Sequence, residues 1–331
     1  MTRVGVVTIG RNEGDRLKRC LASVVGGGRT VVYVDSGSGD GSVAWARSQG
    51  VEVVELDMTL PFTAARARNA GFERLSALDT GVEFVQFADG DCEIAAAWME
   101  RAERELAANP KLGVVCGRRR ERRPGATIYN RLCDMEWNTP VGAAKACGGD
   151  AQMRVSAFKE VGGFSPDLIA GEEPELCVRL RQKGWEILRV DAEMTLHDAD
   201  MTRFGQWWKR NVRGGHAYAE GSSLHGKPPE RHWVREARSN WFWGLLVPLL
   251  ALGLAWPTRG ISSALFLAYP LLFWRVRRAM LRRGFAAGDA APYAFYVTLG
   301  KFPQMLGQLK FIVGRIFGRR SRLIEYKLKN S

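Results

Sequence analysis

The sequence predicts an α/β fold in which helices cover both faces of a mostly parallel sheet, followed by a helical region of different composition. Up to about residue 117, short β-branched runs alternate with helical patterns, as in parallel strands joined by helices. At 46% hydrophobic and 25% charged residues, the composition excludes wholesale disorder. The 331 residues suffice for one large domain, or for one domain with an appendage.

The first region is expected to contain five strands with helices between them. The strands are predicted at Val4–Ile9, Val31–Val34, Val51–Leu56, Phe84–Phe87 and Gly113–Cys116. The helices are predicted from Asn12 or Asp15 onward with Leu17, Leu21 and Val24 on one face, and at Ser42–Ser48, Phe62–Leu78 and Ile94–Ala108. Ligands of such sheets bind at the carboxyl ends of the strands, where Asp35 and Asp89 fall.

Residues 118 to 200 have a less regular pattern. The basic run Arg118–Arg123 is expected to form a surface turn or loop. Gly148–Phe164 is punctuated by glycine, Glu175–Lys183 is predicted as a helix, and Ile187–Val190 as a last strand.

The composition changes after about residue 238. Trp241–Trp256 and Ile261–Trp274 are uncharged runs of sixteen and fourteen residues, separated by a turn. Each is shorter than the roughly 20 residues that span a bilayer comfortably. Tryptophans bound the runs, and arginines flank them on both sides. This pattern favours a short or re-entrant membrane hairpin, whose two flanks would both face the cytoplasm, over a hairpin buried in a soluble protein.

The net charge of +13 lies mostly in the C-terminal tail. From Arg275 to Ser331 there are thirteen Lys or Arg residues against Asp289 and Glu325. Tyr293–Phe317 is amphipathic and predicts helices that lie on a surface. Such a tail could bind nucleic acid or anionic lipid, and the neighbouring tryptophan-bounded runs favour lipid.

Six cysteines are spread through the first 180 residues, without a Cys-x-x-Cys pair. We expect buried free thiols in a reducing compartment rather than disulfides or a zinc site. The N-terminus enters a strand almost at once and lacks the features of a signal peptide. The main domain is therefore expected to be cytoplasmic.

The stretch Ala88-Asp89-Gly90-Asp91 follows an apolar strand. Two carboxylates one residue apart at a strand's end can turn toward one point, which suits a hard divalent cation that bridges to phosphate oxygens. Alone, an Asp-x-Asp sequence has little specificity.

A second acidic strand end is Asp35, which opens the glycine-rich turn Ser36–Gly41. The turn is neither a dinucleotide-binding loop nor a P-loop, because the Asp comes first and no Gly-Lys-Ser/Thr follows. It matches a calcium loop only loosely. A carboxylate here could accept hydrogen bonds from a nucleobase or a ribose, or it could cap the following helix.

Several motifs occur together in a fixed order. They are Thr8–Glu13, Val34–Ser42, Ala67–Gly71, Ala88–Asp91, Gly148–Arg154, Val161–Phe164 and Gly171–Leu180. This order resembles the family-2 inverting glycosyltransferases with a GT-A fold, of the membrane-associated bacterial type. The resemblance covers roughly residues 3–200.

The resemblance implies a nucleotide-sugar site and a metal site. Thr8, Glu13 and Asp35 would line the base and ribose, and Arg68 would lie near the phosphates. Asp91, with Asp89, would hold Mg²⁺ or Mn²⁺ on the diphosphate. His197 could complete the metal shell, or it could be structural; imidazole suits Mn²⁺ better than Mg²⁺.

The family's general base aligns with Glu172-Glu173, where Glu173 replaces the usual Asp. Because Pro174 follows, an extended conformation is expected at Glu173, and Glu172 stays an alternative base. The same acids would also favour a helix N-terminus without any catalysis. On the acceptor side we place Asp150, and also Trp207 and Arg210 of an aromatic-basic segment that lacks the pattern of processive synthases.

These expectations combine into a hypothesis with explicit rivals. Residues 1–225 would form the catalytic domain and 226–331 a membrane-associated region, with a hairpin at about 241–274 and a basic tail at 275–331. The enzyme would move one sugar from a UDP- or GDP-type donor to a lipid-linked or glycan acceptor of the cell envelope, on the cytoplasmic face of the inner membrane, without nucleic acid. The rivals are a polyprenyl-phosphate sugar transferase and a basic protein that binds nucleic acid or lipid.

Overall fold

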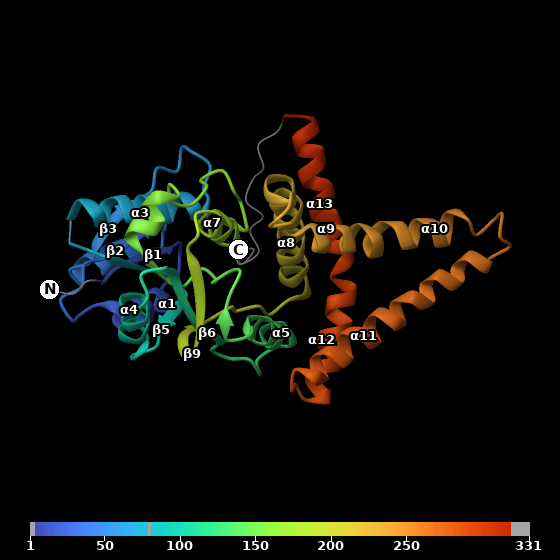
Figure 1. Cartoon of the computed structure of the whole chain (residues 1–331), viewed down its shortest axis with the longest axis horizontal. Helices are drawn as coiled ribbons and strands as arrows, with labels where there is room; N and C mark the ends of the chain where they lie inside the picture. The colour runs from blue at the N-terminus through green and yellow to red at the C-terminus, as the bar shows by residue number, and fades with distance from the viewer. Residues whose placement is uncertain (1–3, 79–80, 319–331) are drawn as a thin grey trace. The chain divides into compact units, whose positions relative to one another are not determined.

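The computed structural model describes residues 4–78 and 81–318 and contains two compact units, Met1–Asp200 and Met201–Ser331 (Figure 1). The sequence-based boundary lay at residue 225, whereas helix α8 (Phe204–His225) belongs to the second unit, because it packs along helix α13 (Lys301–Ile316).

The first unit is built on a nine-stranded sheet of order β3-β2-β1-β4-β8-β6-β9-β5, with β7 paired to β9. The strands are β1 Val4–Gly10, β2 Val31–Asp35, β3 Glu52–Glu55, β4 Phe84–Asp89, β5 Cys92–Ile94, β6 Leu112–Glu121, β7 Gly142–Ala143, β8 Gln152–Arg154 and β9 Glu186–His197. β3, β2, β1 and β4 are parallel, as are β6 and β9, and the remaining pairs are antiparallel. The predicted parallel sheet is confirmed for its first half and is mixed beyond it.

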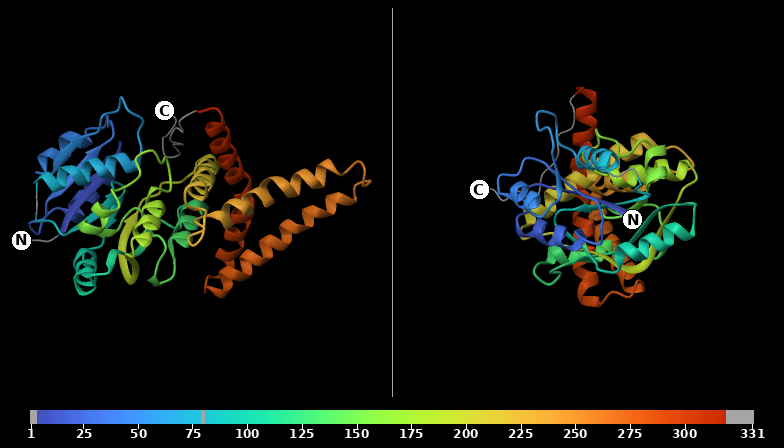
Figure 2. Two further views of the ribbon diagram at one scale, coloured as in Figure 1. Left: turned by 45° about the horizontal axis from the view of Figure 1, so that its top comes forward. Right: turned by 90° about the vertical axis from the view of Figure 1, so that its left-hand side faces the viewer.

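Helices cover both faces of this sheet (Figure 2). They are α1 Asp15–Val24, α2 Ser42–Ser48, α3 Ala64–Leu78, α4 Trp98–Ala108, α5 Ile128–Trp137, α6 Val155–Glu160 and α7 Glu172–Gln182. The predicted apolar face of α1 is confirmed, since Leu17, Leu21 and Val24 are buried. The central strands β1, β2 and β4 are almost wholly buried, so their apolar runs reflect cover on both faces.

Three local predictions were wrong. Arg118–Arg123 is not a surface loop, because residues up to Glu121 continue strand β6 beside β9. Ile94 ends strand β5 instead of beginning a helix. Glu173 is helical rather than extended, because α7 already begins at Glu172 and Pro174 is tolerated in a first helical turn.

The described residues of the second unit form helices joined by turns and loops. Its further elements are α9 Val234–Trp241, the π-helical turn η1 Phe242–Leu246, α10 Val247–Gly253, the 3₁₀ segment η2 Ile261–Leu267, α11 Ala268–Arg282 and α12 Ala287–Leu299. The predicted basic tail thus forms the end of α11 together with α12 and α13, and residues 319–331 lie outside the described part. In the described residues, no helix is both long and apolar enough to cross a membrane.

The predicted hairpin forms from η1 and α10 on one arm and η2 and α11 on the other (Figures 1 and 2). The hydroxyl of Tyr269 donates to the carbonyl of Trp243, and that of Ser262 donates to Ala251, which ties the two arms together. Large apolar side chains of both arms are nevertheless exposed: Leu249 of α10 is 59% and Leu271 of α11 is 71% exposed. The exposure of these side chains contradicts the alternative of a buried hairpin.

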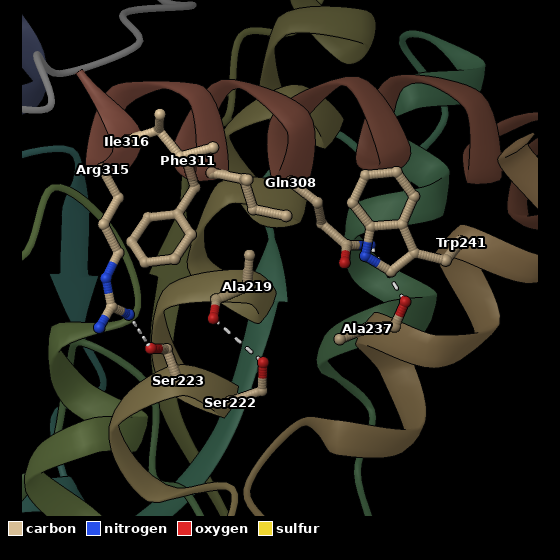
Figure 3. Close-up of a pocket in the computed structure, with 10 residues that line it drawn as sticks. Ala219, Ser222, Ser223, Ala237, Trp241, Gln308, Phe311, Arg315 and Ile316 are labelled. Atoms are coloured by element: carbon tan, nitrogen blue, oxygen red, sulfur yellow. Dashed lines mark hydrogen bonds between the residues drawn. The ribbon is translucent and has the colours of Figure 1, made fainter.

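A cavity of about 400 Å³ lies among α8, α9 and α13 of the second unit (Figure 3). Trp241, Gln308 and Phe311 line it, and the amide nitrogen of Gln308 donates to the carbonyl of Ala237. At its rim, Arg315 donates to the hydroxyl of Ser223.

Helices α8 and α13 approach each other closely at Gly215. A Cβ at Gly215 would lie 1.9 Å from the carbonyl oxygen of Gln304, whereas a Cβ at the preceding Gly214 would meet nothing within 4 Å. We predict that Gly215→Ala lowers the free energy of unfolding of the second unit by about 1–3 kcal/mol through overpacking. Gly214→Ala should raise it by up to about 1 kcal/mol through helix propensity.

Urea unfolding of the two variants checks this close approach. Both substitutions add the same methyl group to one helix, so opposite signs isolate the contact with α13. Equal effects of the two variants would show that the helices do not approach as described.

Candidate active site

The acidic strand ends come together at the carboxyl edge of the sheet, as the sequence predicted. In the register of the sheet, Asp35 of β2 lies opposite Gly10 of β1, and Asp89 of β4 lies opposite Ile9. β1 therefore lies between the two aspartates, which are at nearly the same height along the strands. Asp91 ends the short turn between β4 and β5. β5 pairs with the end of β9, which places Cys92 opposite His197.

Asp35 accepts hydrogen bonds from its own strand and from the turn that follows it. It accepts from the hydroxyl of Tyr33 at 2.7 Å and from the backbone N–H groups of Gly37 and Ser38 at 2.9 and 2.8 Å. Burial and the bond to Asp35 raise the pKa of the Tyr33 hydroxyl, which keeps it a donor. The carboxylate thus holds the turn in place. It does not cap the following helix α2, which begins at Ser42 after Gly41 and has no side-chain cap.

The turns after β1 and β2 are linked to each other. The backbone N–H of Asn12 donates to the Ser38 hydroxyl, and the Asn12 side chain accepts from Gly39. Of the predicted base and ribose residues, Glu13 lies in this region and pairs with Arg16 at 2.8 Å. Thr8 is fully buried inside β1, so its side chain offers no surface to a nucleotide.

Arg68 connects three elements although it is only 3% exposed. From α3 its guanidinium reaches Asp89 at 2.7 Å and Glu172 of α7 at 2.8 Å, above the ring of Phe164. Burial alone would lower the pKa of Arg68, but the carboxylates of Asp89 and Glu172 outweigh it and raise that pKa. Arg68 is thus a permanent cation beside the Asp-x-Asp turn.

A second cation, the partly buried Arg119 of β6, was missed by the sequence analysis. It lies 2.5 Å from Asp150 and 3.9 Å from Asp89. Asp150 is 0% exposed and also accepts from the Thr195 hydroxyl at 3.1 Å. Asp150 is therefore part of the buried charge network and is not exposed to an acceptor. Gly149 allows this packing, because a Cβ there would lie 2.9 Å from Arg68.

Asp91 and His197 form the other side of the cluster. The Nε2 atom of His197 lies 3.4 Å from the carboxylate of Asp91, and its Nδ1 lies 3.6 Å from Glu121 of β6. Glu121, another residue that the sequence analysis missed, is fixed by the backbone N–H of Ala199 at 3.0 Å. A carboxylate behind a histidine is the usual way to orient a metal-binding imidazole.

The ligand types fit a divalent cation. One ligand atom each of Asp91, Cys92 and His197 lie within 4.8 Å of one another, and the same holds for Asp89, Cys92 and Asp150. Burial and the nearby Asp150 raise the pKa of the Cys92 thiol, which disfavours the thiolate. Carboxylate and imidazole ligands then remain, a set that suits Mn²⁺, or Mg²⁺ on the carboxylates.

Glu172 and Glu173 point to different partners. Glu172 pairs with Arg68 and so joins the Asp89 network. The Oε1 atom of Glu173 accepts from the backbone N–H of Cys147 at 2.5 Å and from the thiols of Cys147 and Cys177, each at 3.0 Å. Within the described residues, Glu173 has no ion pair.

The predicted acceptor-side residues Trp207 and Arg210 lie on α8 in the second unit. Trp207 is buried and packs against the ring of Tyr296 at 5.0 Å between centroids. Their role toward an acceptor stays a prediction.

The fold and this acidic strand edge define a GT-A glycosyltransferase domain. Residues 5–160, a little under half of the chain, match the family model described as "Glycosyl transferase family 2". The matched segment includes Asp35, Arg68 and the Asp-x-Asp turn, and it ends before Glu172 and His197.

Known proteins that are similar to this chain include a sequence relative and a solved structure. A TPR repeat-containing protein of Synechococcus elongatus is 31% identical over 141 residues, which are 42% of this chain and 33% of that protein. The chain thus spans about a third of that relative. The mannosyltransferase PcManGT from Pyrobaculum calidifontis, solved with GDP-Man and Mn²⁺, superimposes with a TM-score of 0.60 at 20% identity, over 94% of this chain and 87% of that one. At 20% identity, the similarity to PcManGT shows a shared fold and nothing more.

The pairing of Arg119 with Asp150 can be tested by stability. We predict that Arg119→Met lowers the free energy of unfolding by about 3–5 kcal/mol, because it leaves the buried Asp150 carboxylate uncompensated. The neighbouring Arg120→Met should change it by no more than about 0.5 kcal/mol, since the Arg120 side chain is 53% exposed and pairs with Glu193 on the surface. Urea unfolding followed by circular dichroism compares the two variants. A loss of the same size in both would contradict the buried network.

Proposed function

We propose that the protein is an inverting, metal-dependent glycosyltransferase that moves one sugar from a nucleoside diphosphate sugar to a hydroxyl acceptor. The observation that carries the proposal is the pairing of Asp91 with His197, 3.4 Å apart, beside Asp89 at the carboxyl edge of the sheet that matches the family 2 model. There Arg68 pairs with Asp89 and Glu172, and Arg119 pairs with Asp150, whereas Asp91 faces the imidazole of His197. A carboxylate beside an imidazole is a ligand set that suits a divalent cation.

Asp91 and His197, with Asp89 beside them, would hold Mn²⁺ or Mg²⁺. The bound cation would stabilise the negative charge that develops on the departing nucleoside diphosphate. Arg68 orients Asp89 through their ion pair, and Arg119 does the same for Asp150. Glu121 lies 3.6 Å from Nδ1 of His197, while Nε2 of the same imidazole faces Asp91.

Glu173 is the better candidate for the general base. An acceptor hydroxyl that attacks the anomeric carbon must give up its proton to a carboxylate within hydrogen-bond reach. Glu172 is occupied by Arg68 at 2.8 Å, so its carboxylate serves to position that arginine. Glu173 is held through one oxygen by neutral donors, which fixes its orientation without neutralising its charge. One in-line displacement then inverts the anomeric centre.

The donor is of the GDP or UDP type and the acceptor is lipid-linked or part of a surface glycan. GDP-mannose is the first donor to test, because the PcManGT structure of similar fold contains it together with Mn²⁺. A polyprenyl phosphate acceptor is the alternative, and it is distinguished by extraction of the labelled product into organic solvent.

The metal site is tested by donor binding. We expect calorimetry to detect binding of one nucleoside diphosphate only when Mn²⁺ or Mg²⁺ is present, and Asp91→Asn to weaken that binding at least about 10-fold because a metal ligand is lost. Asp191→Asn, which changes an exposed aspartate of β9, is the matched control and should bind like the unmodified protein. Equal affinity with and without metal would contradict the proposal.

The base is tested by kinetics. We expect Glu173→Gln to lower kcat by about 10²–10⁴-fold, with the dissociation constant of the donor unchanged. Glu172→Gln should instead weaken donor binding, because Arg68 loses one of its two carboxylate partners. If Glu172→Gln abolished turnover with normal donor binding while Glu173→Gln stayed active, the two roles would be reversed.

We further propose that the α10–α11 hairpin docks this enzyme on the cytoplasmic face of the inner membrane. The exposed apolar side chains of the two arms support it: Leu252 is 66%, Ile261 77% and Leu267 67% exposed. Such a contiguous apolar surface is unusual on a monomeric soluble protein. From the middle of α11 onward, Arg275 and Arg278 follow Trp274, which places cations and an aromatic ring where lipid headgroups would begin.

Membrane docking is tested by flotation with phosphatidylglycerol vesicles. The unmodified protein should float and stay bound in high salt, whereas Leu252→Glu combined with Leu267→Glu should remain in the soluble fraction. Leu60→Glu, at a 54% exposed leucine of the first unit, controls for an added acid. If high salt alone releases the protein, the attraction is electrostatic and the hairpin does not insert.

A further inference from the structure

The proposed base belongs to a compact cluster of one carboxylate and two thiols. Cys147 comes from the segment before β8, while Glu173 and Cys177 lie one helical turn apart on α7. All three residues are buried, with exposures of 5%, 6% and 0%. The two Sγ atoms are 3.7 Å apart, and Glu173 Oε1 is 3.0 Å from each of them.

These distances agree with the edges of a tetrahedral metal site. Two thiolates bound to one zinc ion at about 2.3 Å and at the tetrahedral angle are about 3.8 Å apart, and the sulfurs here are 3.7 Å apart. A zinc-bound carboxylate oxygen would lie about 3.5 Å from each sulfur. The carboxylate would therefore need to move by only a few tenths of an ångström from where its hydrogen bonds now hold it.

We propose that Cys147, Glu173 and Cys177 form a binding site for a thiophilic divalent cation of the Zn²⁺ class. The site is separate from the Asp91–His197 pair in its chemistry. Sulfur ligands select Zn²⁺ and similar ions, while Mg²⁺ and Mn²⁺ prefer oxygen and imidazole. Three protein ligands leave the fourth tetrahedral position to water.

The charge balance of binding is well defined. Burial raises the pKa of the Cys177 thiol to about 11, and burial together with Cys177 raises that of Cys147 well above its ordinary value. Both thiols are therefore protonated before the ion arrives. Binding breaks two S–H bonds, forms two metal–sulfur bonds and releases two protons to the solvent. A hard ion binds sulfur too weakly to displace these two protons.

The site has a regulatory consequence that rests on the proposed function. Glu173 is the proposed base, so a bound ion would take the carboxylate that must receive the acceptor's proton. Zinc would then inhibit transfer without competing with the donor. The binding itself does not depend on catalysis and can be measured on a protein that has no activity.

The first experiment is a titration of the full chain with Co²⁺ in the presence of a non-thiol reductant, which excludes a disulfide between the two cysteines. We expect one equivalent to produce thiolate-to-cobalt charge-transfer absorption in the near ultraviolet, and Zn²⁺ to abolish it by displacement. Absence of this band at saturating Co²⁺ would overturn the proposal.

Cysteine variants locate the site. Cys147→Ser and Cys177→Ser should each weaken Zn²⁺ binding by about 100-fold or more, since they remove a direct ligand rather than a supporting group. Cys92→Ser is the matched control, because Cys92 lies with Asp91 and His197 in the other cluster and should not affect the band. A band that is lost in Cys92→Ser and kept in Cys177→Ser would overturn the assignment.

A measurement on the unmodified protein covers the case in which a variant fails to fold. X-ray absorption of the one-to-one zinc complex should count two sulfur ligands at about 2.3 Å, with lighter atoms completing the shell. A shell with no sulfur, or with a single one, would overturn the proposal.

The regulatory consequence is tested last, by transfer assays in Mn²⁺. Zn²⁺ should lower kcat of the unmodified enzyme and have at least about 100-fold lower potency on Cys177→Ser, in proportion to the lost affinity. Zinc binding by a protein without transferase activity would leave the site intact and would contradict only the proposed function. Full activity with the site saturated would overturn the regulatory role.

Discussion

The buried guanidinium of Arg68 is the constraint on which the rest of the site depends. A charge that is 3% exposed must be paired, because an unpaired ion in the interior is strongly unfavourable. Arg68 meets this requirement with Asp89 at the end of β4 and Glu172 at the start of α7. Segments more than a hundred residues apart in sequence are thereby held at one point, and the N-terminal turn of α7 is fixed against the sheet.

Arg119 repeats this arrangement from the opposite side of the sheet edge. It pairs with the fully buried Asp150 and approaches Asp89, whose side chain is 28% exposed. Asp89 is therefore the member of the network that two cations orient while part of it faces outward. Asp91 lies two residues further along, at the turn into β5, and is directed to His197 instead. The network thus separates a set of carboxylates that hold the fold from a carboxylate–imidazole pair suited to a metal ion.

The sequence predicted what depends on local pattern and missed what depends on strand register. The run Ser42–Ser48 is a helix as expected, and the Asp-x-Asp turn ends a buried strand. Arg119 and Glu121 were placed in a surface loop, because a run of arginines is usually solvated. Only the pairing of β6 with the distant β9 brings Glu121 opposite His197. Thr8 and Asp150 were predicted from their motifs to contact the nucleotide and the acceptor, but both are fully buried. A motif shows which part of the fold a residue belongs to, whereas burial decides whether its side chain can reach a ligand.

The divergence of Glu172 and Glu173 follows from helix geometry. Consecutive helical residues point about 100° apart, so two adjacent acids in the first turn of α7 cannot serve the same partner. One faces the guanidinium of Arg68, and the other faces the thiols of Cys147 and Cys177. The extra methylene of Glu173 compared with an aspartate lengthens its reach toward these thiols. The departure from the family's usual residue and the cysteine pair are therefore one structural feature, in which the proposed base is held by groups that also bind thiophilic metal ions.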